Sequence, residues 1–509
     1  MPNNIGYSYP LKSSFGAIFF FLFAAGAKKY AFSCSLKEQK YAFSCSLGLK
    51  KHAFSCSIEK FLVPLQRNSE KDKPFLCTFL TMAVDFLHIL SDQRAELERL
   101  DVSQLVTRKE EQLINLNSPL AQVVIGVRRS GKSTLCEKRL LESGLPFGYI
   151  NFDDDRLGKL GRNDFDELLK TLYRINGDFN HLLLDEVQDI DGWELFVNRM
   201  LRQGMHLIIT GSNANLLSGE LATHLTGRYN EVELYPFSFS EYCVVQHVDM
   251  QSYTTKACAM RDRALDTYLF DGGFPELMNL SKPEQEVYVR SLVKTIIEKD
   301  IARRYKIRYV QTLTDIANQV LDEFSDEQSY ATIQEKHNLS SAHTAKKYMQ
   351  YLQNAYLIYG MPRFSLKSQE RRTVHKYYAM DTAMVAKRDE TLMTENLGLR
   401  LENVVAIELR RRAKKSQQIY YYRKVRDYEI DFIIVEGTEV KELIQVTYDF
   451  RNPSTKLYNR EVGNLFKASD KLHCDKMTLI MMYGEKREIV EKNKTARCVL
   501  ATDWLQNIV

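Results

Sequence analysis

The sequence lacks several features that would assign a class at once. None of its nine cysteines forms a Cys-x-x-Cys pair, and their spacing fits no common metal site. The 70 basic and 65 acidic residues leave a net charge of +5, which is too small to indicate nucleic-acid binding by itself. A hydrophobic share of 44% is that of an ordinary soluble protein, and we expect a reduced, cytoplasmic one.

The first eighty residues differ from the rest of the chain. A Phe-rich, uncharged run at residues 15–27 is too short to span a bilayer, although its length suits the core of a signal peptide. The run Ala-Phe-Ser-Cys-Ser then occurs three times with an eleven-residue period. We interpret residues 1–81 as a disordered or spuriously translated extension, with the functional start near Met82 and no membrane association. The alternative is an export signal followed by cysteines that form cross-links.

The most informative segment is residues 126–134, Gly-Val-Arg-Arg-Ser-Gly-Lys-Ser-Thr, which we call the phosphate loop. It matches Gly-x-x-x-x-Gly-Lys-Ser/Thr, a loop that wraps the phosphates of a nucleoside triphosphate. Gly126 and Gly131 let the backbone turn so that several N–H groups point at one anion. Lys132 is expected to reach the β- and γ-phosphates, and Ser133 to bind Mg²⁺. The other residues that we expect to bind the nucleotide are Arg129, Ser130 and Thr134.

Apolar runs alternate with helical patterns after this loop, which predicts a parallel sheet covered by helices on both faces. The run at residues 181–186 ends in Asp185 and Glu186, as a Walker B strand does. We expect Asp185 to hold Mg²⁺ and Glu186 to activate the attacking water. Ser212 or Asn213, after the next run, is expected to orient that water.

Arg228 closes the run Leu-Thr-Gly-Arg and is a candidate catalytic residue. An arginine here is expected to reach a γ-phosphate, either in its own subunit or in a neighbouring one. The sequence leaves both alternatives open, and with them the question of a homo-oligomer.

In this order, the phosphate loop, Leu-Asp-Glu-Val-Gln, Thr-Gly-Ser and Leu-Thr-Gly-Arg resemble the AAA-type ATPases of bacteria and archaea with a C-terminal domain of unknown function. Further runs at residues 268–276 and 297–301 look like signatures of the same family, and the likeness extends from about Met82 to the C-terminus. The resemblance implies ATP and Mg²⁺ as cofactors. It assigns nucleotide, metal and water-activating roles to Lys132, Ser133, Asp185 and Glu186.

We therefore expect an α/β fold built from several parts. They are a P-loop core with a parallel sheet (residues 82–240), a helical lid (241–310), a winged-helix module (311–365) and a restriction-endonuclease-like α/β domain (366–509). In the winged-helix module, Ser340 and Ser341 precede a helix whose basic and polar side chains point outward. Such a helix enters the major groove of double-stranded DNA, or alternatively the module contacts proteins.

The C-terminal domain of the family resembles the PD-(D/E)xK nuclease fold. Glu402 and Glu408 on a helix, and Asp431 on a strand, match its metal-binding carboxylates. However, Gln445 and Thr447 stand where such a nuclease has a carboxylate and a lysine. We expect a domain that binds nucleic acid without cutting it. Basic and aromatic residues at 410–415 and 420–424 are expected to contact phosphates and bases, unless the first cluster is a solvated helix face.

The expected function is an Mg²⁺-dependent ATPase that couples ATP hydrolysis to rearrangement of its C-terminal modules on DNA or on a protein partner. One alternative is an ATP-dependent nuclease of a mobile-element or defence system. The other is a slow, ATP-gated regulatory switch that acts through protein contacts.

Overall fold

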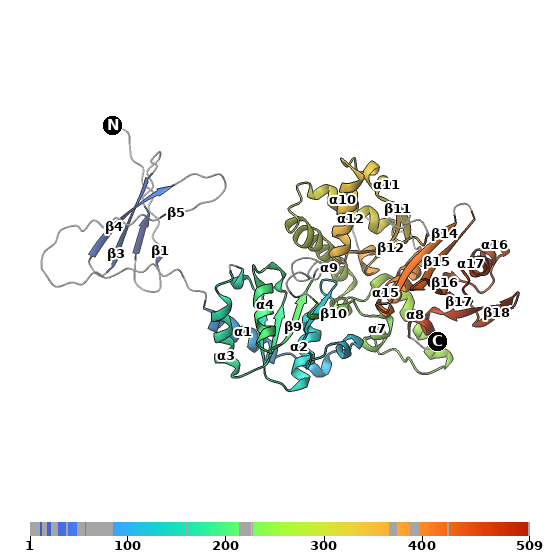
Figure 1. Cartoon of the computed structure of the whole chain (residues 1–509), viewed down its shortest axis with the longest axis horizontal. Helices are drawn as coiled ribbons and strands as arrows, with labels where there is room; N and C mark the ends of the chain where they lie inside the picture. Colours follow the sequence, from blue (N-terminus) through green and yellow to red (C-terminus); the bar gives the residue numbers. More distant parts are fainter. Residues whose placement is uncertain are drawn as a thin grey trace. The chain divides into compact units, whose positions relative to one another are not determined.

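The computed structural model describes residues 85–158, 160–212, 225, 227–365, 374–386, 396–424 and 427–506, and the backbone of five short strands before residue 58. The chain divides into two units, Met1–Met82 and Ala83–Val509 (Figure 1). In the first unit, β3 (Lys29–Leu36) pairs with β4 (Gln39–Leu47), so two copies of the repeat form antiparallel strands. Most of residues 1–81 lie outside the described residues, and their interpretation stays a prediction. In the described part of the chain, no helix has both the length and the apolar character that crossing a membrane requires.

The second unit begins with a parallel sheet of five strands in the order β10-β6-β9-β8-β7. The strands are β6 (Ala121–Gly126), β7 (Phe147–Asn151), β8 (His181–Asp185), β9 (His206–Gly211) and β10 (Tyr229–Leu234). The side chains of β6, β8 and β9 are almost all buried on both faces, as the apolar runs predict, whereas the edge strand β10 is partly exposed. One face packs against α2 (Lys132–Ser143), and the other against α1 (Phe86–Glu98), α3 (Phe165–Asn176) and α4 (Trp193–Arg202). The predicted layered sheet is confirmed.

A helical segment follows the sheet, as predicted. It contains α7 (Phe239–Val245), α8 (Thr255–Asp271), α9 (Lys282–Thr295) and a π-helix, η6 (Ile296–Arg303). Gly272 ends α8 with a φ of +68°, and a Cβ there would lie 1.8 Å from Oδ1 of Asp381. The next residue, Gly273, donates its N–H to Asp381 at 2.8 Å. The Gly-Gly pair is therefore needed for the close packing of α8 against the chain around Asp381.

Three helices and a small sheet make up the next part. They are α10 (Val310–Asp322), β11 (Asp326–Ser329), α11 (Tyr330–Lys336), α12 (Ala342–Asn354), β12 (Ile358–Pro362) and β13 (Val374–Ala379), with the antiparallel order β11-β13-β12. Ser341 caps α12 by accepting a hydrogen bond from Thr344 N at 3.2 Å, as predicted. The buried side of α12 contains Ala345, Met349 and Leu352.

The last part contains a mixed sheet of six strands in the order β14-β15-β16-β17-β19-β18 (Figure 1). The strands are β14 (Gln417–Lys424), β15 (Tyr428–Glu436), β16 (Glu439–Asp449), β17 (Met477–Tyr483), β18 (Arg487–Glu491) and β19 (Lys494–Leu500). The sheet contacts α15 (Leu397–Arg412) and α17 (Asn464–Leu472). Asp431 lies on β15 and Gln445 on β16, as the sequence predicts.

Candidate functional site

The phosphate loop connects the end of β6 to the start of α2. Gly126 has a φ of +141°, and a Cβ at this position would lie 2.0 Å from the carbonyl oxygen of Leu234. Only glycine fits here, because β10 passes directly beside the loop. Lys132 is buried, and its Nζ lies 3.1 Å from Val127 O and 3.9 Å from Oε1 of Glu186. The loop thus brings an ammonium group next to the predicted catalytic carboxylate.

Asp185 is the centre of a hydrogen-bonded cluster formed by the ends of β8 and β9 and the first turn of α2. Ser133 Oγ donates to Oδ1 of Asp185 at 2.8 Å, and Thr210 Oγ1 donates to the same oxygen at 2.5 Å. Thr210 Oγ1 also accepts a hydrogen bond from Glu186 N at 3.0 Å. Burial, and then the charge of Glu186, raises the pKa of Asp185 to about 7. Because β9 lies between β6 and β8, Thr210 reaches both acids and fixes their positions.

Glu186 lies just beyond β8 with a φ of +55°, a conformation that few residues other than glycine adopt. Gln188 Nε2 donates to Oε2 of Glu186 at 2.6 Å. Such backbone strain is common at functional sites. Ser212 Oγ is buried and has no hydrogen-bond partner among the described residues, so it is able to bind an incoming polar group. Asn213 lies outside the described residues.

The two arginines of the phosphate loop contact the helical segment. Arg129 Nη1 lies 2.6 Å from Oε2 of Glu276, and both side chains are half exposed. Arg128 Nη1 lies 3.2 Å from Oδ1 of Asp300, whose other oxygen is buried without a hydrogen-bond partner among the described residues. Burial raises the pKa of Asp300 to about 6, against the opposing charge of Arg128. Sequence reasoning did not assign Asp300 to the site, although it noted the run Ile-Glu-Lys-Asp-Ile that contains it. The π-helical form of this run is a further functional signal.

The backbone of the phosphate loop is tied to the rest of the core by Arg108. Its guanidinium donates to Ser130 O at 3.2 Å and to Tyr235 O at 2.8 Å. Its Nε donates to Oε1 of Glu241 at 2.7 Å, and the other oxygen of Glu241 lies 3.6 Å from Arg411. All these groups are buried or nearly so. Hydrogen bonds and ion pairs therefore connect Ser130, through Arg108 and Glu241, to Arg411 on α15 of the C-terminal domain.

Thr134 and Arg228 complete the predicted set. Thr134 is partly exposed in the first turn of α2, beside Ser133. Arg228 is exposed and precedes β10, whose Tyr229 pairs with Ala121 at the start of β6. Six residues of strand separate Arg228 from the level of Gly126, which is about 20 Å at 3.3 Å per residue. The structure does not bring Arg228 to the phosphate loop of its own chain, so only a role in a neighbouring copy remains as a prediction.

The fit of the site to Mg²⁺ depends on its oxygen atoms. Among the described residues, no group of three or more His, Cys, Asp or Glu side chains is placed to hold a metal by itself. Mg²⁺ usually binds through one or two carboxylates together with substrate phosphates. The hydroxyl of Ser133 and the carboxylate of Asp185, 2.8 Å apart, provide such donors. These residues fit Mg²⁺ that arrives with a nucleotide.

The predicted residues of the C-terminal domain separate into two groups. Glu402 and Asp431 line a cavity of about 800 Å³ together with Gln445, Thr447 and, unexpectedly, Lys376 of β13. We call this cavity the carboxylate pocket. Glu408 lies elsewhere, 3.1 Å from Arg411 and 2.7 Å from Arg412. Glu408 therefore holds arginines and does not belong to a metal site.

Residues 410–412 do not form a solvated face, and contact of the basic residues 410–415 with nucleic acid stays a prediction. Arg410 lies 2.6 Å from Glu233 of β10, and Arg411 donates to Pro236 O at 3.1 Å. Arg412 donates to the carbonyl oxygens of Trp504 and Leu505, each at 3.0 Å. This cluster holds the C-terminal domain against the core and against the end of its own chain.

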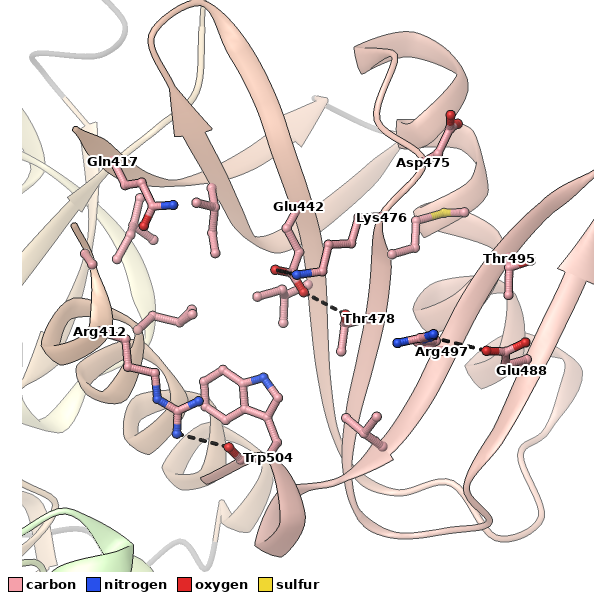
Figure 2. Close-up of a pocket in the computed structure, with 17 residues that line it drawn as sticks. Arg412, Gln417, Glu442, Asp475, Lys476, Thr478, Glu488, Thr495, Arg497 and Trp504 are labelled. Atoms are coloured by element: carbon pink, nitrogen blue, oxygen red, sulfur yellow. Dashed lines mark hydrogen bonds and ion pairs between the residues drawn. The ribbon is translucent and has the colours of Figure 1, made fainter. Parts of the chain in front are cut away.

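A groove of about 720 Å³ lies on the C-terminal sheet beside Arg412 and Trp504 (Figure 2). Polar and apolar side chains line it in similar measure, and its cations pair with carboxylates. Lys476 lies 2.8 Å from Glu442, and Arg497 lies 3.2 Å from Glu488. The pairing leaves little positive charge to attract an anionic ligand.

Comparison with known proteins gives first the class and then the family. A model of an AAA domain matches residues 118–243, so the parallel sheet with its phosphate loop is an AAA-type P-loop core. Two models of domains of unknown function, DUF8612 and DUF4143, match residues 262–395 and 397–486.

The chain is 30% identical over 412 residues to the uncharacterized protein MJ1544 of Methanocaldococcus jannaschii, which covers 78% of this chain and 90% of that protein. It is also 30% identical over 413 residues to an uncharacterized protein of Haemophilus influenzae, covering 78% and 96%. The chain belongs to the family of these two proteins. Among solved structures, the Walker-type ATPase PABY2304 of Pyrococcus abyssi matches with 18% identity and a TM-score of 0.37, over 56% of this chain and 95% of that one.

Proposed function

We propose that the chain binds ATP with Mg²⁺ at the phosphate loop and hydrolyses it to ADP and phosphate. The observation that carries this proposal is the convergence of Lys132 and Ser133, which follow β6, with Asp185 and Glu186 at the end of β8, across the intervening strand β9. The match to an AAA domain supports nucleotide binding at this place. The arrangement supplies both a cation for phosphate and carboxylates for a metal ion and a water molecule.

Each residue of the cluster has a distinct role in this proposal. Lys132 neutralises phosphate charge, and main-chain N–H groups of the loop bind phosphate oxygens. Bound Mg²⁺ supplies further charge neutralisation. Glu186 accepts the proton of the attacking water, and Ser212 donates a hydrogen bond nearby. Thr210 keeps Asp185 and Glu186 in place through its two hydrogen bonds.

Binding and turnover of ATP by the full chain test the proposal. Lys132→Ala is expected to lower turnover by about a hundredfold or more and to weaken ATP binding, because one positive charge at the phosphates is lost. Lys170→Ala is the matched control, since Lys170 lies on α3 and is largely exposed. Binding is measured with a fluorescent ATP analogue, and turnover by phosphate release. A folded wild-type protein without affinity for ATP or ADP in the presence of Mg²⁺ refutes the proposal.

A second proposal concerns the modules after the core. The order of three helices and a three-stranded antiparallel sheet at residues 310–379 supports a winged helix that binds double-stranded DNA. The side of α12 that faces away from its buried residues is exposed and partly basic; it contains His343, Lys346, Lys347 and Gln350. DNA binding is expected to weaken with salt and to fall when Lys346 and Lys347 are both changed to Glu. Unchanged DNA binding by this variant shows that α12 does not contact the DNA, whereas no DNA binding by the wild-type chain leaves a protein partner as the alternative.

For the last domain we propose a nuclease-like fold that does not cut DNA. Gln445 and Thr447 support this view. An amide binds a divalent metal ion less well than a carboxylate does, and a hydroxyl activates a water molecule less well than a lysine does. Incubation of the full chain with plasmid DNA and Mn²⁺ tests it. Cleavage that disappears in Asp431→Ala establishes the nuclease alternative. Slow ATP turnover with a large ATP-dependent change in protease resistance instead favours the regulatory switch.

A further inference from the structure

Lys376 enters the carboxylate pocket from another part of the fold. It lies on β13, the central strand of the β11-β13-β12 sheet. Its Nζ is 2.7 Å from Oε1 of Glu402, 3.0 Å from Oε1 of Glu429 and 3.9 Å from Oδ1 of Asp431. Lys376 is only 5% exposed. The ammonium group therefore lies among three carboxylates, two of which match the metal-binding acids of a nuclease fold.

The pocket also contains a carboxylate oxygen without a partner. Glu461, from the π-helix η7 (Asn459–Gly463), is fully buried and lines the same cavity. Arg460 bonds its Oε1, whereas its Oε2 has no hydrogen-bond partner among the described residues. Buried polar atoms are rarely left in this state in a native protein. One carboxylate oxygen of this pocket is therefore not neutralised by a hydrogen bond from the described residues.

The geometry shows what balances the negative charge of the pocket. Lys376 Nζ lies within 4 Å of carboxylate oxygens of Glu402, Glu429 and Asp431. The protein therefore places a cation of its own among these carboxylates.

We propose that the ammonium group of Lys376 takes the place of a divalent metal ion in a site formed by Glu402 and Asp431. The ligand of the vacated site is a hard divalent cation such as Mg²⁺ or Mn²⁺, because all of its donors are oxygen atoms. The site is closed to metal while β13 stays in its sheet. This inference does not depend on ATP hydrolysis at the phosphate loop.

Mn²⁺ binding to the full, nucleotide-free chain tests the inference. Lys376→Met removes the charge and keeps the length of the side chain. We expect this variant to gain about one Mn²⁺ site per chain relative to wild type, measured by the loss of the free Mn²⁺ signal in electron paramagnetic resonance. The gain is expected to disappear when Asp431→Asn is added. Lys424→Met is the control, because Lys424 lines the same pocket but is half exposed and pairs with Asp427.

Three results overturn the inference. They are wild-type binding of Mn²⁺ that Asp431→Asn abolishes, no gain of Mn²⁺ binding in folded Lys376→Met, and an equal gain in Lys424→Met. If Lys376→Met does not fold alone, folding that returns with Mn²⁺ supports the inference. If Mn²⁺ does not restore folding, Lys376→Gln replaces Lys376→Met, because it keeps a polar group in the pocket. A gain of Mn²⁺ binding by Lys376→Gln supports the inference, and no gain overturns it. The wild-type measurement decides independently of either variant.

Discussion

Two places in this chain bring a lysine together with carboxylates, and they differ in what the lysine contacts. At the phosphate loop, Lys132 donates to a backbone carbonyl and stays 3.9 Å from Glu186. In the carboxylate pocket, Lys376 lies 2.7 Å from Glu402 and 3.0 Å from Glu429. The first ammonium keeps its charge for an anionic ligand, whereas the second is neutralised by the protein. The same residue types therefore produce an anion site in one place and an internal ionic cluster in the other.

The strongest test of this difference is Glu186→Gln. We expect ATP turnover to fall by about a thousandfold, since an amide does not accept the proton of the attacking water. Binding of ATP is expected to remain, because Lys132 and the loop amides are intact. Glu402→Gln is the counterpart in the carboxylate pocket and is expected to leave turnover unchanged. Phosphate release and binding of a fluorescent ATP analogue measure the two effects.

Equal losses of turnover in both variants contradict the comparison. They indicate either that the carboxylate pocket takes part in hydrolysis or that both substitutions damage the fold. Circular dichroism of each variant separates these outcomes.

Arg411 of α15 joins the C-terminal domain to Glu241, which also binds Arg108 beside the phosphate loop. Removal of Arg411 is expected to have the next largest effect, in this case on stability. Arg411→Met leaves Glu241 and Glu408 without this partner in a buried interface. We expect a loss of about 4 kcal/mol in the free energy of unfolding, the usual cost of breaking one side of a buried ion pair. Urea unfolding followed by circular dichroism measures it. Arg423→Met is the control, since Arg423 pairs with Glu327 at 2.6 Å but is half exposed, and its loss is expected to stay below about 1 kcal/mol.

The sequence predicts the phosphate loop well because the loop is local. Its glycines, Lys132 and Ser133 lie within a few residues, so their spacing alone defines the geometry. The parallel sheet is predictable for a similar reason, because apolar runs of strand length alternate with helical patterns. Asp185 and Glu186 follow from the end of one such run. These predictions use periodicity and short motifs, which a single sequence contains.

Contacts between distant segments are different, and three of them were not predicted from the sequence. The basic run at residues 410–412 looks like a solvated face, because nothing in it shows that Glu233 and Glu241 lie opposite. Lys376 belongs to another module, so the pocket seemed to lack a lysine when Gln445 and Thr447 were considered alone. Asp300 is isolated in sequence from Arg128, and only the packing of η6 joins them. Ion pairs between residues of different modules are therefore the feature of the candidate sites that sequence patterns do not predict.

His375 provides a pH-dependent test of the strand that holds Lys376. Burial lowers the pKa of His375 to about 4 from its ordinary 6.5, so the unfolded chain binds the proton more readily. This residue's contribution to stability is complete above pH 6.5 and is lost as the pH falls toward 4. The loss is expected to reach about 2 to 3 kcal/mol after allowance for partial exposure. His375→Gln is expected to remove this part of the pH dependence, measured by urea unfolding at several pH values.

Other groups titrate over the same range, so the difference between the wild-type and His375→Gln curves is the relevant quantity. Parallel curves for the two proteins contradict the prediction. They mean that protonated His375 is accommodated at no cost, and that β13 is less firmly packed than the burial of Lys376 indicates.

The smallest effect is expected for the exposed ion pair of the phosphate loop. Arg129 and Glu276 lie 2.6 Å apart, yet both are half exposed and compete with water for each other. Glu276→Gln is therefore expected to change the free energy of unfolding by less than about 1 kcal/mol. Asp300→Asn breaks the buried counterpart, in which Arg128 of the phosphate loop pairs with Asp300 of η6. It is expected to cost more, because Arg128 loses its charged partner where water is largely excluded. If Glu276→Gln lowers the free energy of unfolding, measured with urea, as much as Asp300→Asn does, burial does not determine the strength of these two ion pairs. The electrostatic argument that separates Lys132, which is available to a ligand, from Lys376, which is neutralised by buried carboxylates, then fails as well.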